Sequence, residues 1–361
     1  MCQSCIPRIP ENMEKAGLFA QQMITMLNHG ALVPMISIGH QTKLFDIMDT
    51  LDWSTSVEIA ECANLNERYV REWLGAMASG RIVEYNPKAN TYYLPPENAI
   101  FLTRKSNEKN MSSVASLITV WAGVEEKVTR CFKNGGGVPY SEYNGFHEAM
   151  GDLSAANVGK NLTEIILPEN QSLFDRLENG ISILDIGCGD GQVLLALAQY
   201  FPKSKFYGID LCDAPIKSAQ NKARIRCLNN ITFKQEDLLA YSPTNKYDLI
   251  TAFDVIHDLA FPDKVLQLVN NWLNDDGTFL MMDINASSHL ENNLENPFAP
   301  FLYTASTLHC MTVSLAQGGM GLGTVWGKEK AVEMLKEAGF SNTQVQNFEH
   351  DLFNNYYFSS K

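Results

Sequence analysis

The chain has 361 residues, which is long for one ordinary domain and typical of two. Its composition, 45% hydrophobic, suffices for sizeable cores, and its net charge of -13 makes nucleic acid and anionic membranes poor partners. The first segment is polar, so no signal peptide is expected. The sequence has no apolar run long enough for a membrane-spanning helix, so none is expected.

The first part of the chain, residues 1–105, has the pattern of a helical segment followed by a winged helix. Residues 11–52 are expected to form two or three helices with a Met-rich apolar face, which is typical of a core or of a dimer seam. The winged-helix pattern consists of a helix capped by Ser56, a second helix from Glu67 to Ser79 capped by Asn66, and strands at 82–85 and 91–94.

A winged helix suggests DNA binding, but the expected recognition helix is electrically balanced. Glu67 and Glu72 offset Arg68 and Arg71, whereas a helix that reads DNA should present a basic face. The sequence therefore favours dimerisation, as a homodimer, over nucleic-acid binding for this domain.

Residues 106–175 read as a helical connector. Three consecutive glycines, at positions 135–137, break it, and an aromatic cluster follows. The cluster comprises Tyr140, Tyr143, Phe146 and His147. These side chains are expected either to close over a ligand, as substrate-binding residues, or to pack between domains.

From residue 176 to 361 apolar strands alternate with helical segments. Such alternation predicts a doubly wound α/β fold, in which a mostly parallel sheet carries helices on both faces. Strands are expected at 181–186, 205–210, 231–234, 247–253, 278–284, 343–348 and 352–358, and helices at 191–200, 213–227, 262–273 and 327–338.

The first of these strands leads into a glycine turn. Gly187, Gly189 and Gly191 follow it, and a helix follows them, so free backbone N–H groups and a helix N-terminus would face a ligand. The spacing is not the G-x-G-x-x-G of a dinucleotide site, and Asp185 before the first glycine suits an ammonium group better than a pyrophosphate.

Acidic residues follow the next strands at the same edge of the expected sheet. Asp210 is placed to accept ribose hydroxyls, and Asp237 and Leu238 are placed to contact an adenine. As an ordered set, these motifs resemble motifs I to V of the class I S-adenosylmethionine (SAM) methyltransferases. The resemblance implies a SAM site formed by Asp185, Gly187, Cys188, Gly189, Asp210, Leu211, Asp237, Leu238, Phe253 and Asp254.

The stretch from Phe253 to Asp263 is similar to that of small-molecule O-methyltransferases with an N-terminal winged-helix-like dimerisation domain. The resemblance implies that His257 is a general base or a positioning residue, that Asp258 orients the substrate, and that Asp283 holds the histidine. A further acid of that family has no clear match in the glycine-rich loop at 317–327. This loop and the segment before it also resemble a branch of methyltransferases and regulators without named substrates. His309 and Trp326 are further candidate substrate contacts.

Three functions remain open at this point. The favoured one is a cytoplasmic enzyme that moves a methyl group from SAM to an oxygen or nitrogen of a small molecule, leaving S-adenosylhomocysteine. The alternatives are a SAM-sensing winged-helix regulator and an NAD-linked oxidoreductase, which Asp210 alone would permit. Eight scattered cysteines suggest a reducing compartment, and neither Cys2 with Cys5 nor the acids after the fourth strand have the spacing of a metal site, so no metal is expected.

Overall fold

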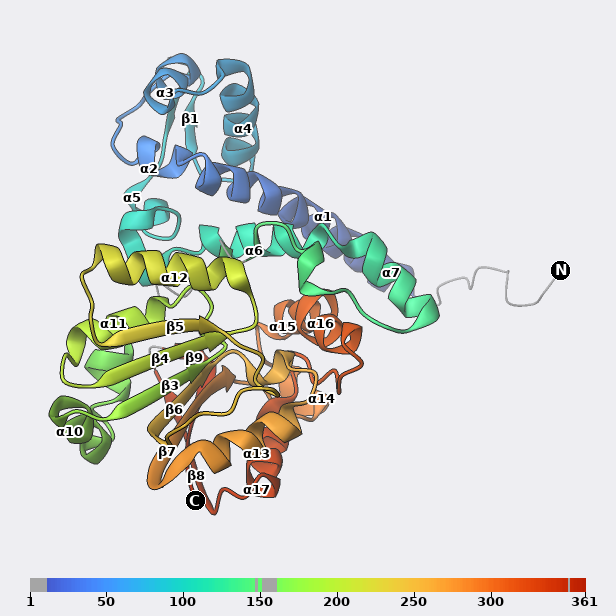
Figure 1. The fold of residues 1–361 in the computed structure, drawn as a ribbon. Helices are drawn as coiled ribbons and strands as arrows, with labels where there is room; N and C mark the ends of the chain where they lie inside the picture. The colour runs from blue at the N-terminus through green and yellow to red at the C-terminus, as the bar shows by residue number, and fades with distance from the viewer. Residues whose placement is uncertain (1–11, 147–148, 151–160, 350) are drawn as a thin grey trace. The chain divides into compact units, whose positions relative to one another are not determined.

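The computed structural model describes residues 12–146, 149–150, 161–349 and 351–361 (Figure 1). Two compact units divide between Thr119 and Val120, inside the connector expected at 106–175. Of the described helices, none has both the length and the apolar character needed to cross a membrane.

The first unit is mainly helical with one small hairpin. Its elements are α1 (Met13–Gln41), α2 (Leu44–Met48), α3 (Ser56–Ala63), α4 (Glu67–Ser79), β1 (Glu84–Asn86), β2 (Thr91–Tyr93), α5 (Pro96–Ala99), the 3-10 helix η2 (Arg104–Lys109) and α6 (Ser112–Ala122), which runs across the boundary. The two helices and the hairpin expected for a winged helix are therefore present as α3, α4 and β1–β2.

Helix α3 begins one residue earlier than expected, because its cap is Thr55 and not Ser56. The Thr55 side chain accepts a hydrogen bond from Glu58 N, and Glu58 Oε2 accepts one from Thr55 N at 2.8 Å, which is a capping box. Ser56 donates instead to Glu67 at 2.6 Å, across to the next helix. Asn66 caps α4 as expected, accepting from Arg68 N at 3.0 Å.

The core of this unit lies where the second half of α1 meets α4. The ring of Trp73 packs edge-on against Phe45 at 5.2 Å, and its indole N–H donates to the Met35 carbonyl at 2.8 Å. The first half of α1 is different, because its large apolar side chains are exposed.

The second unit contains the sheet that the sequence predicts. Its elements are α7 (Glu125–Asn134), the 3-10 helix η3 (Tyr140–Glu142), the π-helix η4 (Leu162–Ile166), α10 (Gln171–Asn179), β3 (Ser182–Ile186), α11 (Gln192–Tyr200), β4 (Lys205–Asp210), α12 (Asp213–Ile225), β5 (Ile231–Gln235), β6 (Tyr247–Phe253), the 3-10 helix η5 (Ile256–Asp258), α13 (Pro262–Trp272), β7 (Leu273–Ile284), α14 (Leu290–Asn293), α15 (Ala299–Ala305), the π-helix η6 (Ser306–Cys310), α16 (Met311–Ala316), α17 (Gly327–Glu337), β8 (Asn342–Phe348) and β9 (Asp351–Ser360).

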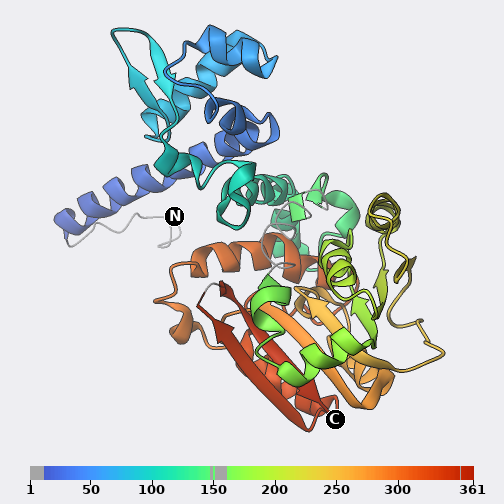
Figure 2. The ribbon, with the colours of Figure 1, turned by 90° about the vertical axis from the view of Figure 1, so that its left-hand side faces the viewer.

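The seven strands follow the order β5-β4-β3-β6-β7-β9-β8. The first five are parallel, and the antiparallel pair β8–β9 closes one side, as Figure 2 shows. The strand order reverses between β3 and β6, so a crevice is expected at the carboxyl ends of these two strands.

Strand β7 begins earlier than the sequence suggests. The strand is expected at 278–284, but residues 273–277 already belong to β7, and Leu273 pairs with Tyr247. The register then shifts, so that Leu249 pairs with Thr278, and the added residues contain an irregularity of the strand.

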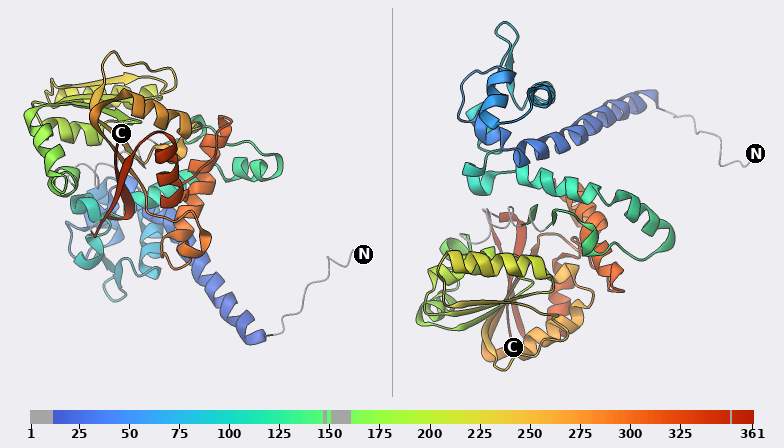
Figure 3. Two further views of the ribbon diagram at one scale, coloured as in Figure 1. Left: turned by 90° about the horizontal axis from the view of Figure 1, so that it is seen from below. Right: turned by 45° about the horizontal axis from the view of Figure 1, so that its top comes forward.

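Alternate residues of the central strands supply two cores, one on each face of the sheet. Leu280 and Met282 of β7 face the core that α11 and α12 cover, while Phe279 and Met281 face the core that α13 and α17 cover. In the right-hand view of Figure 3, helix α12 runs across the face of the sheet that it covers. The alternation follows from the two-residue period of a strand that is buried on both sides.

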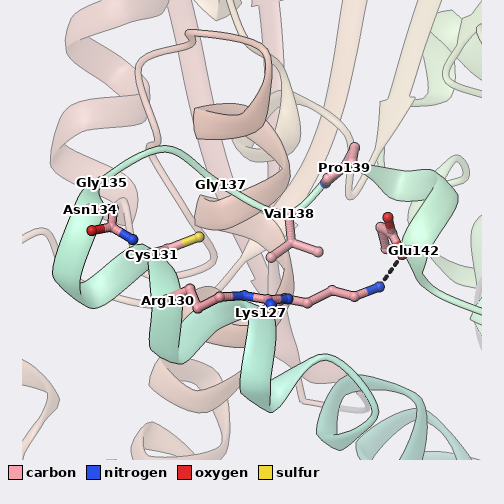
Figure 4. Close-up of a pocket in the computed structure, with 9 residues that line it drawn as sticks. All are labelled: Lys127, Arg130, Cys131, Asn134, Gly135, Gly137, Val138, Pro139 and Glu142. Carbon is pink, nitrogen blue, oxygen red and sulfur yellow. Dashed lines mark hydrogen bonds and ion pairs between the residues drawn. The ribbon is translucent and has the colours of Figure 1, made fainter.

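The segment between α7 and η3 is held in place against α16. A Cβ atom at Gly137 would lie 2.0 Å from the Thr312 carbonyl oxygen, and Val138 N donates to that same oxygen at 3.1 Å. Lys127 of α7 forms an ion pair with Glu142, across the small hollow shown in Figure 4. These contacts determine where η3, and with it Tyr140, lies.

Replacing Gly137 by alanine is expected to lower the free energy of unfolding by about 1–3 kcal/mol, since backbone must move to admit the methyl group. Gly75→Ala is the matched control, because a Cβ there meets nothing within 4 Å on the exposed side of α4. Urea unfolding of both variants checks this, and an unfolding free energy of Gly137→Ala equal to that of the wild type would contradict it.

Candidate active site

The glycine turn after β3 forms the floor of the site. Gly187, Gly189 and Gly191 all have positive φ, between 54° and 75°, which side-chain-bearing residues rarely adopt. At Gly187 a Cβ would also lie 2.6 Å from Val255 Cγ2, so only glycine lets the turn approach the segment after β6. At Gly189 a Cβ would meet no described atom within 4 Å, which leaves room for a ligand.

Asp185, near the end of β3, is a buried carboxyl group beside this turn. Burial raises its pKa to about 7, although the hydrogen bond from Thr251 Oγ1 at 2.7 Å lowers it, and the charge of Asp210 raises it further. A carboxyl group in this state gains charge when a cation binds beside it.

Two acids end the neighbouring strands. Asp210 closes β4, and its two oxygens accept from Gly189 N at 2.9 Å and Cys212 N at 2.8 Å, which fixes the carboxylate toward the turn. Asp237 follows β5 and accepts from Leu239 N at 2.9 Å. Each carboxylate oxygen has two lone pairs, so both groups can still accept hydrogen bonds from a ligand.

One cavity of about 430 Å³ runs along these strand ends. All ten residues expected to contact the cofactor line it, and so do Asp258, Tyr140 and Phe146. The walls also include residues that the sequence did not single out, namely Met150, Asp190, Gln192, Val193, Cys212, Glu236, Leu239, Val255, Leu259, Ala260, Phe261, Val265, Met282 and Gln317. Gln317 is the first residue of the glycine-rich loop, which is the signal by which it could have been found; Met150 has no comparable local signal.

His257 lies just behind the cavity wall, in η5. Its Nδ1 is 2.8 Å from Asp283 Oδ1 at the end of β7, the pairing that the sequence suggests. Its Nε2 is 3.4 Å from Asp258 Oδ1. Burial alone would lower the pKa of His257, but the charges of Asp283 and Asp258 outweigh it and hold that pKa well above its usual range. Both ring nitrogens of the histidine therefore face carboxyl groups, which favour its protonated form.

Asp258 joins this ion pair to the cavity. The hydroxyl group of Tyr140 donates to Asp258 Oδ2 at 2.7 Å, and burial together with the charge of Asp258 raises the pKa of Tyr140, so that this phenol stays protonated. His309 lies farther off, with Nδ1 at 3.8 Å from the same oxygen. Asp258 is thus oriented from both sides.

The other candidate substrate contacts take different places. Trp326 does not line the cavity; its buried indole donates to Asp283 Oδ1 at 2.9 Å and so helps to hold the carboxylate behind His257. Tyr143 donates to the Leu308 carbonyl at 2.7 Å, and His309 stacks on Phe146 at 4.1 Å, so both lie behind the wall. His147 is outside the described residues.

Two groups of potential metal ligands share His257. They are His257 with Asp258 and Cys310, and His257 with Asp254 and Asp283, and the donor atoms within each group lie within 4.8 Å of one another. The contacts above account for His257 through ion pairs with carboxylates. Metal independence stays a prediction.

The cavity suits a ligand with positive charge and hydroxyl groups. Asp254 stands in a left-handed conformation with φ of 56°, and no hydrogen-bond donor of the described chain reaches its buried Oδ1. Burial, and then the charge of Asp283, raise its pKa to about 7, although His257 lowers it. Helix α11 begins at the same turn without a side-chain cap, so its N–H groups suit a carboxylate.

Comparisons with known proteins agree with this site. Residues 30–104 match the family described as "Rv2258c-like winged HTH domain", and residues 177–339 match the "Methyltransferase domain" family. Among curated proteins, (S)-coclaurine N-methyltransferase of Papaver somniferum is 25% identical over 144 residues, which are 39% of this chain and 41% of that protein. Malonyl-[acyl-carrier protein] O-methyltransferase of a Paenibacillus strain is 27% identical over 183 residues, 49% of this chain and 62% of its own. The chain spans about half the length of these relatives.

Solved structures are similar over nearly the whole chain. Human N-acetylserotonin methyltransferase in complex with SAM has a TM-score of 0.69 at 14% identity, covering 94% of this chain and 97% of that one. An O-methyltransferase family protein from Burkholderia thailandensis has a TM-score of 0.66 at 12% identity, covering 95% and 98%. At such identities the likeness establishes the fold.

A doubly wound fold, a glycine turn flanked by acids at three strand ends and a match to the methyltransferase family thus coincide in one cavity. The residues present fit the methionine ammonium group, the ribose and the adenine of SAM. Residues 177–339 thus form a class I SAM-dependent methyltransferase domain, and residues 30–104 before them form a winged helix-turn-helix domain.

Proposed function

We propose that this protein transfers a methyl group from SAM to the oxygen or nitrogen of a small molecule and releases S-adenosylhomocysteine. The proposal rests on one observation, a cavity that all ten expected cofactor contacts line. The same cavity extends to an aromatic end, where one carboxylate is held in a fixed orientation. Both acceptor atoms occur among the similar proteins, as the names of the N-methyltransferase and the O-methyltransferase above state.

SAM supplies a methyl group that is already activated by its sulfonium charge. The chain's own part is to bind, align and exclude water. We assign the cation-facing role to Asp185, the ribose contact to Asp210 and the adenine contact to Asp237 with Leu238. The turn at Gly187 and Gly189 admits the ligand backbone closely, since neither position carries a side chain.

Proton transfer in this site falls to Asp258 rather than to His257. His257 does not line the cavity, its two ring nitrogens face the carboxyl groups of Asp283 and Asp258, and the Tyr140 phenol donates to Asp258. Asp258 is the group of these three that can accept. We therefore propose His257, with Asp283 and Trp326, as positioning residues that orient Asp258.

The winged helix supports assembly better than DNA binding. On α4, Arg68 forms an ion pair with Glu72, and Arg71 lies 3.4 Å from Glu67, so the helix offers phosphates little uncompensated charge. The free cysteines of the described chain, such as Cys62 and Cys131, support a reducing, cytoplasmic setting. The regulator alternative rests on the winged-helix match alone.

A homodimer through α1 is part of the proposal. Seven large apolar side chains on the first half of this helix are between 37% and 70% exposed, a state that is costly for a lone helix in water. They are Met13, Leu18, Phe19, Met23, Ile24, Met26 and Leu27. A second copy would cover them.

Phe19→Glu is expected to weaken self-association by at least about tenfold, since a charge would be buried at the seam. Gln21→Glu is the control, because Gln21 shares its side of the helix with Thr25 and Asn28 rather than with the apolar side chains. Light scattering on a size-exclusion column measures the masses. A monomeric wild type, or a dimer that Phe19→Glu leaves intact, would contradict the α1 seam.

Cofactor binding is expected to release a proton through Asp185. The carboxyl group is largely protonated below its pKa of about 7, and a cationic ligand favours the ionised form. Affinity for SAM should therefore rise with pH through 7, by up to about tenfold per unit below the pKa. Calorimetry in two buffers with different ionisation enthalpies counts the protons. Asp185→Asn should show fewer, and an equal count would remove Asp185 from this role.

Methyl transfer is tested with SAM that carries a deuterated methyl group, offered together with a metabolite extract and followed by mass spectrometry. A labelled small molecule is expected. Asp258→Asn should lower kcat by about 10²–10⁴-fold, the usual contribution of a proton acceptor. His257→Ala should lower it less and leave the shape of its pH profile unchanged.

Loss of the rising limb of the profile in His257→Ala would instead make His257 the base. Absence of any labelled product, with S-adenosylhomocysteine bound, would favour the regulator.

A further inference from the structure

The cavity that holds the proposed methyl-transfer site is lined by acidic residues without cationic ones. Seven carboxyl groups face it, and no lysine, arginine or histidine of the described chain lines it. The acids are Asp185, Asp190, Asp210, Glu236, Asp237, Asp254 and Asp258. Lys222 compensates one of them, Asp190, from outside the lining.

The expected cofactor contacts include the acids at the ends of β3, β4 and β5 and Asp254 after β6, but they do not include Asp258. Asp258 lines the cavity together with Tyr140, whose hydroxyl group donates to it. Asp254, Asp258 and Asp283 bring three carboxyl groups to one histidine, His257. Among the described residues, carboxyl groups therefore outnumber cationic side chains at this end of the cavity.

The position and the hydrogen bonds of Asp258 suit contact with a ligand. Its side chain is only 13% exposed, Tyr140 holds Oδ2, and Oδ1 lies 3.4 Å from His257 Nε2. That approach lacks hydrogen-bond geometry, and no other donor within the described residues reaches Oδ1. Oδ1 is itself buried, whereas Oδ2 of this fixed carboxylate accepts one hydrogen bond from Tyr140 and has a second lone pair with which to accept from a ligand in the cavity.

The surface around Asp258 is aromatic and apolar. The rings of Tyr140 and Phe146 lie 5.9 Å apart at an angle of 58°, and Phe261, Leu259 and Met150 complete this part of the wall. Ring faces attract cations, and the attraction grows where water is excluded.

We propose that the methyl acceptor is a cationic amine on an aromatic or apolar skeleton, with its ammonium group against Asp258 and its skeleton against Tyr140 and Phe146. The inference rests on the proposed methyl transfer. It narrows the methyl acceptor to an amine, which is methylated on its nitrogen. Phenolates and carboxylates would meet the negative charge of Asp258 in the same place, and such a like-charge contact opposes binding.

The reaction balances with the groups present. The ammonium group gives one proton to the Asp258 carboxylate, which frees the nitrogen lone pair. The nitrogen forms the new N–CH3 bond as the methyl–sulfur bond breaks, and the electron pair of that bond stays with sulfur. The positive charge passes from sulfur to the methylated nitrogen, and the proton on Asp258 leaves to solvent with the product.

The test compares three molecules of one shape and different charge. N-methyl-2-phenylethylamine is cationic, 2-phenylethanol is neutral and 3-phenylpropionate is anionic at pH 7.5. Calorimetry first measures S-adenosylhomocysteine binding to the full chain, then each probe against the saturated protein. We expect the amine to bind at least about tenfold more tightly than the alcohol, with no binding of the carboxylate at the same concentration.

Asp258→Asn should remove the preference for the amine, with circular dichroism confirming that the variant is folded. Asp263→Asn, an exposed acid on α13 outside the lining, should keep it. Equal affinities, a preference for the alcohol or the carboxylate, no binding of the amine at 10 mM or a preference that survives in Asp258→Asn would each overturn the inference. Failure of S-adenosylhomocysteine to bind would instead count against the proposed methyl transfer itself.

Discussion

Buried carboxyl groups that outnumber their cationic side-chain neighbours are the constraint on which the rest of this site depends. An unpaired charge inside a protein costs several kcal/mol, and a carboxyl group avoids that cost by taking up a proton or by meeting a cation. Asp185 and Asp254, both with pKa values raised to about 7, stand between these two outcomes. A bound cationic ligand stabilises the charged form of such groups. The acidic part of the site is therefore the part that suits a positively charged ligand.

Direct contacts connect the segments that form the two ends of the cavity. Gly187 of the cofactor turn abuts Val255, which directly precedes η5 with His257 and Asp258. On the other side α16 and the glycine-rich loop hold the same segment, as the Ser314 hydroxyl group donates to the Leu259 carbonyl at 2.8 Å and Met320 N donates to that of Ala260 at 2.9 Å. The position of Asp258 is thus set by contacts from both neighbours, which gives its carboxylate the precision that methyl transfer demands.

Much of this arrangement could be predicted from the sequence because its signals are local. β-Branched apolar runs indicate the strands, and in a parallel sheet their carboxyl ends share one edge, so acids after separate strands must converge. For that reason Asp185, Asp210 and Asp237 were expected together, and the cavity does bring them together. The pairing of Asp283 with His257 was suggested by a family resemblance and agrees with the 2.8 Å contact.

What could not be predicted depends on contacts between distant segments. Trp326 was expected at the substrate, but its indole turns to Asp283, 43 residues away in sequence. Likewise, the raised pKa of His257 follows from two carboxyl groups that only the fold sets beside it, and it is one reason to propose Asp258 as the proton acceptor. The exposed half of α1 is a further case. An apolar helix face has the same sequence pattern whether it packs against the core of its own chain or against a second copy, so the pattern alone did not distinguish the two.

The measurement that tests the account most directly is a crystal structure of the protein with S-adenosylhomocysteine. We expect density along the carboxyl ends of β3, β4 and β5, with the ribose hydroxyl groups on Asp210, the amino group beside Asp185 and the sulfur directed toward the side of Asp258 and Tyr140. Density elsewhere in the molecule, or none along these strand ends at a saturating concentration, would contradict it.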